Sequence, residues 1–380
     1  MKIGVLIDEL LAGGVQKTAV EETRHLLQQG EDAELLVLHE RSEGYQYEDL
    51  LKGVPVRFLS EQFPILEHSL KIPSFNVLST YHIVSFFVAP FSQLWRRFDV
   101  IISHGAFASA VAWNVWKLYG IRYIPFVWDP ATYIFKKVYS KSRFNPFVFT
   151  LRPILTMMEG SIMNDATLIL SPSNVHAETL MKDYKMDRSK IKTIYPACYP
   201  AEKIPEKRGD YLISFTRWES SKNPFFLIDL MERLPNARLI VAGEWTDKQG
   251  YESFLQKIKE KGIEERIVVH PAVKKSEIPK LCSTARVWVH PNFEAFGMGA
   301  LEVASQGCPI IMPKGSGATE LFEHGVHGFF PEQGDLETYT EYASKLLSDE
   351  RLAWKMGYEA WKIANEHTWE NHVKNLLEVI

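Results

Sequence analysis

The segment that most constrains the fold of this chain runs from residue 285 to residue 306. It starts with an apolar run at residues 285–289, which predicts a strand, and it ends with residues 300–306, which have the pattern of a helix start. The loop between them carries two glycines. A buried strand that leads through a short loop into a helix is the repeating unit of parallel α/β sheets. The segment therefore predicts an α/β fold.

Two glutamates in this segment, Glu294 and Glu302, are candidates for binding. They lie eight positions apart, and on one helix they would point about 80° away from each other. We therefore expect Glu294 in the loop, where Gly297 and Gly299 let the backbone approach a diphosphate at the helix start. Glu302, expected in the first helical turn, could accept hydrogen bonds from ribose hydroxyls, and Glu294 from sugar hydroxyls. A solvated loop carboxylate and an ordinary helix-start carboxylate are the alternative interpretation.

The spacing of these glutamates, Glu-Ala-Phe-Gly-Met-Gly-Ala-Leu-Glu, resembles the signature of the retaining nucleotide-sugar glycosyltransferases of family 4. The resemblance continues downstream through residues 313–320 and 325–328, and upstream to Arg217 and Lys222. It covers the C-terminal half well and the N-terminal half weakly. It implies the GT-B fold, in which two Rossmann-like doubly wound domains face each other across a cleft and a C-terminal helix crosses back to the N-terminal domain. It also implies a UDP- or GDP-linked sugar as co-substrate, without a cofactor.

The length of 380 residues is comfortable for two domains of about 150 to 200 residues each. Residues 196–210 carry three prolines and several charges, which is typical of a linker. We expect an acceptor-binding domain at residues 1–203, a donor-binding domain at residues 204–365 and a crossover helix at residues 366–380.

Composition excludes several classes. A formal net charge of −4 gives no indication of a nucleic-acid partner. The three cysteines, at positions 198, 282 and 308, are odd in number and irregular in spacing, which fits neither a disulfide framework nor a zinc site. The apolar run at the N-terminus is too short for a signal peptide and predicts a first strand. These observations favour a cytoplasmic protein.

The N-terminal half alternates predicted strands, at residues 2–8, 33–38, 56–59 and 100–103, with helical stretches. Gly13 and Gly14 follow the first strand, at the edge where ligands bind in doubly wound folds. A tight turn without a ligand explains them about as well, but the resemblance implies that they face the donor phosphates and sugar.

Two polar residues follow later strands. His104 follows the fourth predicted strand; a lone histidine there is more often structural, whereas the resemblance implies contact with the donor sugar near the reaction centre. Asp129 could contact the acceptor, although a helix cap before Ala131 is the favoured interpretation.

In the C-terminal half, Arg217 and Lys222 lie between a predicted strand and a helix whose first turn is expected to hold Pro224. Two cations there could clamp a diphosphate and stabilise the charge that grows on the leaving group. Solvated surface cations are the alternative. The resemblance favours the clamp, although Thr216 replaces the usual glycine before the arginine.

The expected site therefore has two groups of residues and no metal. Those expected to act in catalysis are His104, Arg217, Lys222 and Glu294. Those expected to bind the donor are Gly13, Gly14, Arg217, Lys222, Glu244, Val273, Glu294, Phe296, Gly297, Met298, Gly299, Ala300 and Glu302.

The resulting prediction is a retaining, metal-independent transfer of a hexose-type sugar to an acceptor hydroxyl, in a lipid-linked or envelope glycan. The chain has no Asp-x-Asp triplet, the usual hint of a metal-bound diphosphate. A GT-B sugar-nucleotide 2-epimerase and a non-catalytic sugar-nucleotide-binding partner subunit are the alternatives.

Two stretches suggest peripheral binding to the inner face of the membrane. The first, from Ile72 to Trp95, has no charged residue but contains prolines and polar residues that make it a poor spanning helix. The second, from Tyr133 to Met158, has five cations, no acidic residue and many aromatics. Cations attract anionic lipid head groups by roughly 1 kcal/mol each. A core helix and a solvated basic face explain these stretches equally well.

Overall fold

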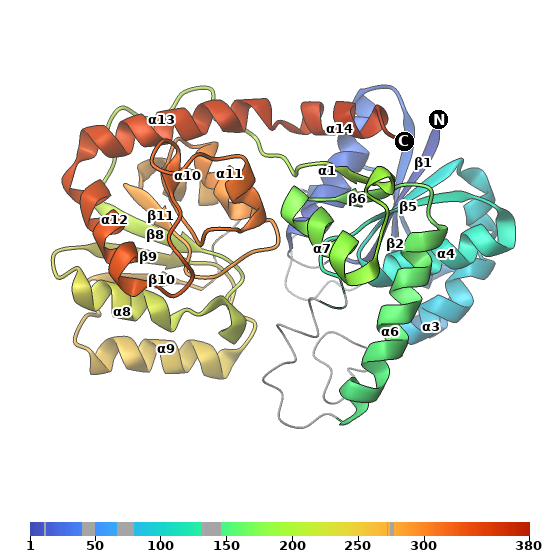
Figure 1. The fold of residues 1–380 in the computed structure, drawn as a ribbon, viewed down its shortest axis with the longest axis horizontal. Coiled ribbons are helices and arrows are strands. Elements are labelled where there is room, and N and C mark those ends of the chain that lie inside the picture. Colours follow the sequence, from blue (N-terminus) through green and yellow to red (C-terminus); the bar gives the residue numbers. More distant parts are fainter. Residues whose placement is uncertain are drawn as a thin grey trace. The chain divides into compact units, whose positions relative to one another are not determined.

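The computed structural model describes residues 1–10, 13–39, 50–66, 80–130, 132, 146–271, 273 and 277–380. The chain divides into two compact units, each a sheet covered by helices (Figure 1). The first contains Met1–Tyr195 together with Trp369–Ile380, and the second is Pro196–Thr368. The first crossing between the units, after Tyr195, thus lies at the start of the predicted linker rather than at residue 203.

The first unit is built on a seven-stranded parallel sheet in the order β3-β2-β1-β4-β5-β6-β7. Most of its strand residues are buried, as expected for a sheet with helices on both faces. The strands are β1 (Lys2–Glu9), β2 (Asp32–His39), β3 (Val56–Phe58), β4 (Val100–His104), β5 (Arg122–Phe126), β6 (Ile169–Ser171) and β7 (Ile191–Thr193).

Helices cover both faces of this sheet. Ile3, Val5 and Ile7 of β1 share a core with α1 (Gly14–Gln28) and α14 (Trp369–Leu377). Leu6 belongs to the core on the other face, with α4 (Ala106–Tyr119), α6 (Pro146–Asp165) and α7 (Asn174–Tyr184). The alternation of β1 side chains between two cores follows from the two-residue period of a strand.

Two further features of the first unit bear on the predictions. Ser173 caps α7 by accepting a hydrogen bond of 3.1 Å from the His176 amide. The helix α3 (Thr80–Val88) is followed by short 3-10 turns at Ala89–Phe91 and Gln93–Arg97. Among the described residues, no helix combines the length and apolar character needed to cross a bilayer.

The second unit repeats this plan with a six-stranded parallel sheet in the order β10-β9-β8-β11-β12-β13. Its strands are β8 (Tyr211–Phe215), β9 (Arg238–Ala242), β10 (Ile267–His270), β11 (Val287–Val289), β12 (Ile310–Ile311) and β13 (Gly328–Phe329). Its helices are α8 (Phe225–Arg233), α9 (Lys248–Glu260), α10 (Ile278–Thr284), α11 (Met298–Ala304), α12 (Leu336–Ser348) and α13 (Glu350–Glu366).

In each sheet the order of the strands changes direction at the first strand. The change lies between β1 and β4 in the first sheet and between β8 and β11 in the second. In open α/β sheets, ligands bind outside the carboxyl ends of the strands at this topological switch point. The loops that follow these four strands are therefore the places where functional side chains are expected.

Two local predictions differ from the structure. The helix α11 begins at Met298, before the predicted residue 300, so Glu302 is its fifth residue and lies outside the first turn. Pro224 is the N-cap of α8 and not part of its first turn. Between α12 and α13 lies Asp349, whose side chain accepts a hydrogen bond of 2.9 Å from the Leu352 amide and caps the start of α13.

Candidate active site

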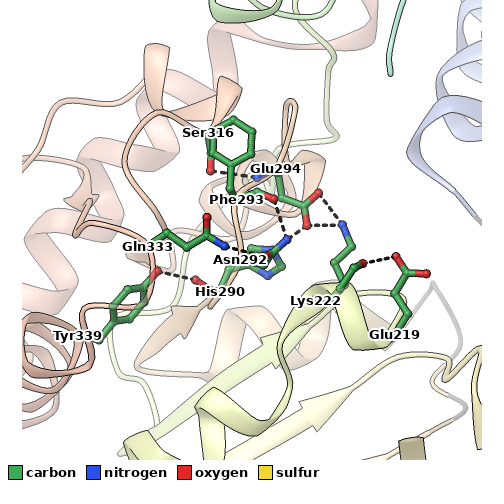
Figure 2. Close-up of polar contacts among 10 residues, drawn as sticks. Glu219, Lys222, His290, Asn292, Phe293, Glu294, Ser316, Gln333 and Tyr339 are labelled. Atoms are coloured by element: carbon green, nitrogen blue, oxygen red, sulfur yellow. Dashed lines mark hydrogen bonds and ion pairs between the residues drawn. The ribbon is translucent and has the colours of Figure 1, made fainter. Parts of the chain in front are cut away.

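Three charged or polar side chains meet at the switch point of the second sheet (Figure 2). The Lys222 ammonium, after β8, lies 2.6 and 2.8 Å from the two carboxylate oxygens of Glu294, after β11. The Nε2 atom of His290 lies 2.8 Å from the same carboxylate. The structure thus brings together two of the predicted site residues, and it adds His290, to which the sequence assigned no role.

The surroundings hold the His290 ring in place. The ring stacks on Trp288 with a centroid distance of 5.2 Å and an interplanar angle of 7°. The His290 carbonyl accepts a hydrogen bond of 2.9 Å from the Tyr339 hydroxyl. The ring is buried and stacked on Trp288 of β11, and Tyr339 of α12 holds its backbone, so the ring presents Nε2 to Glu294.

Glu294 is ionised at neutral pH. Burial alone raises the pKa of this carboxyl, but Lys222 and His290 outweigh burial and lower the pKa from 4.5 to about 2. The side chains of Lys222 and Glu294 are 20% and 19% exposed. The pair can therefore be reached from solvent, and a ligand phosphate could compete with Glu294 for Lys222.

The backbone around Glu294 is held by the loop at residues 313–320. The Glu294 amide donates to Ser316 Oγ over 3.2 Å, and the Gly317 amide donates to the Glu294 carbonyl over 3.2 Å. Ser316 is fully buried. Its role was not predicted from the sequence, although the resemblance included its loop.

The conformation and packing of the loop before α11 explain why Gly297 and Gly299 are glycines. Gly297 is the N-cap of α11 and has a φ of 93°, which a residue with a Cβ rarely adopts. A Cβ at Gly299 would lie 3.2 Å from the Trp288 ring. Close approach of the backbone to a ligand, the predicted reason for both glycines, stays a prediction.

Lys222 is positioned by an unusual backbone turn. It ends a 3-10 turn, Ser220–Lys222, and its amide donates to the Glu219 carbonyl over 2.9 Å. The next residue, Asn223, has a φ of 51°, in the left-handed region. Asparagine tolerates this conformation better than most residues. Arg217 follows β8 and is exposed.

The other predicted donor-binding residues lie around this cluster in the second unit. Glu244 is exposed and follows β9, whereas Phe296 is buried. Met298 and Ala300 belong to the first turn of α11. Val273 follows β10, and its neighbours 272 and 274–276 lie outside the described residues.

In the first unit, His104 is placed at the carboxyl end of β4 but is buried. Its Nε2 atom lies 2.8 Å from Glu22, and its Nδ1 atom accepts a hydrogen bond of 3.3 Å from the Trp128 indole. Both ring nitrogens are therefore occupied by protein groups. The contact with a donor sugar that the resemblance implies stays a prediction.

The remaining predicted residues of the first unit lie near the same edge of the sheet. Gly13 is the extended N-cap of α1 and Gly14 its first residue. Asp129 is exposed and lines a small cavity together with Trp128 and Glu159. The helix cap proposed for Asp129 depends on Ala131, which lies outside the described residues.

Asp8, at the same edge, was not predicted as functional. Burial and the neighbouring Glu9 raise the pKa of its carboxyl to about 8. The only signal in the sequence was its position at the end of the first strand.

Comparison with known proteins shows to which family the chain belongs. Residues 12–201 match the model of "Glycosyltransferase Family 4", and residues 200–363 match that of "Glycosyl transferases group 1". Mannosylfructose-phosphate synthase from Agrobacterium fabrum is 24% identical over 243 residues, which are 58% of this chain and 54% of that protein. The chain thus spans about half the length of the curated relatives it matches.

Solved structures share the fold over the whole chain. Anabaena HepE, in complex with UDP and glucose, superposes with a TM-score of 0.76 at 18% identity and covers 100% of this chain and 99% of its own. Sucrose-phosphate synthase from Thermosynechococcus elongatus has a TM-score of 0.76 at 13% identity and covers 100% and 98%. The chain belongs to glycosyltransferase family 4, the glycosyl transferases group 1, and has the GT-B fold.

Proposed function

We propose that this protein is a retaining, metal-independent glycosyltransferase that moves a hexose-type sugar from a UDP- or GDP-linked donor to an acceptor hydroxyl. The observation that carries the proposal is the cluster of Lys222, Glu294 and His290 at the switch point of the second sheet. Membership of the family supports it, and so does the similarity in fold to HepE, whose structure contains UDP and glucose.

In the proposed reaction, the bond between the anomeric carbon and the diphosphate oxygen breaks, and its electron pair leaves with the nucleotide diphosphate. The acceptor oxygen forms the new bond on the same face of the sugar, and the acceptor proton passes to the leaving phosphate. Negative charge grows on the diphosphate. Preorganised cations stabilise such charge, and Lys222 and Arg217, after β8, are suited to this role.

The ion pair between Lys222 and Glu294 suggests how the site is organised before the donor binds. Lys222 favours the ionised form of Glu294, and each side chain holds the other in place while no donor is bound. When the diphosphate takes over Lys222, the Glu294 carboxylate, still bonded to His290, can accept hydrogen bonds from sugar hydroxyls.

The test is a mass-spectrometric screen of a nucleotide-sugar panel against cell lipid and soluble extracts. The proposal predicts free nucleotide together with a glycosylated product. An interconverted nucleotide sugar in the absence of any acceptor would point to the 2-epimerase. Donor binding without turnover under any condition would point to a non-catalytic partner subunit.

We also propose that the acceptor is lipid-linked or otherwise amphiphilic and is met at the cytoplasmic membrane surface. Large apolar side chains are exposed on α3, on the 3-10 turn that follows it and on α6. These exposed side chains are Ile83, Phe87, Phe91, Ile154 and Met157. The helix α4 contacts both α3 and α6. Residues 72–79 and 133–145 of the two proposed membrane-binding stretches lie outside the described residues.

A further inference from the structure

A fully buried carboxylate in the first unit joins two histidines from distant parts of the chain. Glu22 lies in α1, and its two oxygens are each 2.8 Å from an Nε2 atom, one of His104 at the end of β4 and one of His372 in α14. All three side chains are at most 1% exposed. The proposed transfer, as described so far, does not use Glu22 or His372.

The hydrogen-bond partners fix where the protons lie around Glu22. The Trp128 indole can only donate, so the Nδ1 atom of His104 accepts and its proton sits on Nε2, facing Glu22. The Nδ1 atom of His372 lies 2.6 Å from the Tyr195 carbonyl, which can only accept, so this nitrogen carries a proton. His104 is thereby held as one neutral tautomer.

Glu22 is ionised in this network. Burial raises the pKa of its carboxyl, but His104 and His372 outweigh burial and lower the pKa well below 4.5. His372 thus bridges the Glu22 carboxylate and the Tyr195 carbonyl, with one ring nitrogen at each.

The contact between Glu22 and His372 connects His104 with the two points where the chain leaves and re-enters the first unit. Tyr195 is the last residue before the crossing into the second unit, and α14 starts with Trp369, directly after the return. A buried contact of a carboxylate with histidines is weak evidence for stability, because desolvation of the carboxylate offsets the attraction. A role in holding one conformation is then the better explanation.

We propose that Glu22, held in place by His372, is a positioning residue that fixes the orientation and the Nε2–H tautomer of His104 for glycosyl transfer. The inference rests on the proposed function and on the predicted contact of His104, at the carboxyl end of β4, with the donor sugar. It makes the conformation of His104 depend on the C-terminal helix. In other enzymes, groups that orient a functional histidine set its tautomer in the same way.

The experiment compares Glu22→Met, which keeps the volume but removes both acceptors, with Glu22→Gln in the full-length protein. Glutamine can accept from His104 and donate to His372, so it should preserve the tautomer. We expect Glu22→Met to lower kcat by about ten- to a hundredfold with little change in the donor KM. Glu22→Gln should keep kcat near the wild-type value. Glu21→Gln is the matched control, because Glu21 is a buried neighbour in α1 that binds Arg24.

A second readout is independent of activity. Two-bond proton–nitrogen NMR spectra of histidine rings distinguish protonated from unprotonated nitrogens. They should show a single Nε2–H tautomer for His104 in the wild type and in Glu22→Gln, and its loss in Glu22→Met. A Glu22→Met protein with wild-type kcat and an unchanged His104 tautomer would overturn the inference.

If Glu22→Met does not fold, the pair His372→Gln and His372→Asn tests the same inference. The glutamine amide can replace Nε2 and keep the bond to Glu22, whereas the asparagine amide can replace only Nδ1 and keeps the bond to Tyr195. We expect the larger loss of kcat in His372→Asn, and equal kcat values in both variants would contradict the inference. Absence of transfer by the wild type would refute the proposed function alone, since the NMR spectra still decide on the network.

Discussion

At the scale of single residues, Lys222 is the side chain on which the proposed chemistry depends most. We expect Lys222→Ala to lower kcat by on the order of a hundredfold or more, because it removes a preorganised cation beside the departing diphosphate. Lys248→Ala is the matched control, since Lys248 is an exposed cation of the same unit, with a side chain 89% exposed. Steady-state kinetics with the preferred donor would measure both, and unaltered kinetics for Lys222→Ala would contradict the assignment.

Glu294 should also give the second unit a characteristic sensitivity to acid. Its pKa in the folded protein is about 2, below the ordinary 4.5. The stability that it contributes is therefore fully present above pH 4.5 and is lost as the pH falls toward 2. Urea unfolding of wild type and Glu294→Gln should show a smaller difference at pH 3 than at pH 7. A difference that grows toward acid pH would be inconsistent with an ionised, paired Glu294.

At the scale of elements, the backbone at Asn223, between the 3-10 turn Ser220–Lys222 and α8, sets the direction of the Lys222 side chain. Asn223 adopts a φ of 51° there, and we expect Asn223→Ala to destabilise the protein by about 1 kcal/mol. Asn223→Gly should restore stability, because glycine adopts this conformation freely. Denaturant midpoints of the three proteins measure this effect. Equal stability of the alanine and glycine variants would show that the backbone conformation is not responsible.

The elements themselves were largely predictable, because apolar runs and capping residues are local signals. β1 and β4 follow the strands predicted at residues 2–8 and 100–103 closely. The start of α11 was misplaced because Gly297 lets the helix begin directly after the loop. That displacement moved Glu302 out of the first turn.

The polar partners within the sites were harder to predict, because they come from distant segments. Ser316 lies 22 residues from Glu294, and His372 lies 350 residues from Glu22. The hydrophobic periodicity of one segment carries no information about a contact with a distant segment. Lys222 and Glu294 could be predicted individually from the family resemblance, but their direct ion pair requires the order of β8 and β11 in the sheet.

At the scale of the whole molecule, membrane association is open to a direct test. Sedimentation with anionic liposomes should show binding that weakens with salt, because basic side chains attract anionic head groups. Replacing Lys136, Lys137 and Lys141, which lie outside the described residues, by glutamate should reduce it. Replacing Lys248, Lys257 and Lys259 of α9 is the matched control. No binding at low salt, together with efficient transfer to a purely soluble acceptor, would refute the membrane proposal.

The central claim is a retaining transfer that uses protein cations in place of a metal. The most direct measurement is the anomeric configuration of the product, determined by NMR after reaction with an α-linked nucleotide sugar in the presence of EDTA. The account predicts an α-linked product formed at the same rate with and without the chelator. A β-linked product, or loss of turnover in EDTA that magnesium or manganese restores, would contradict it.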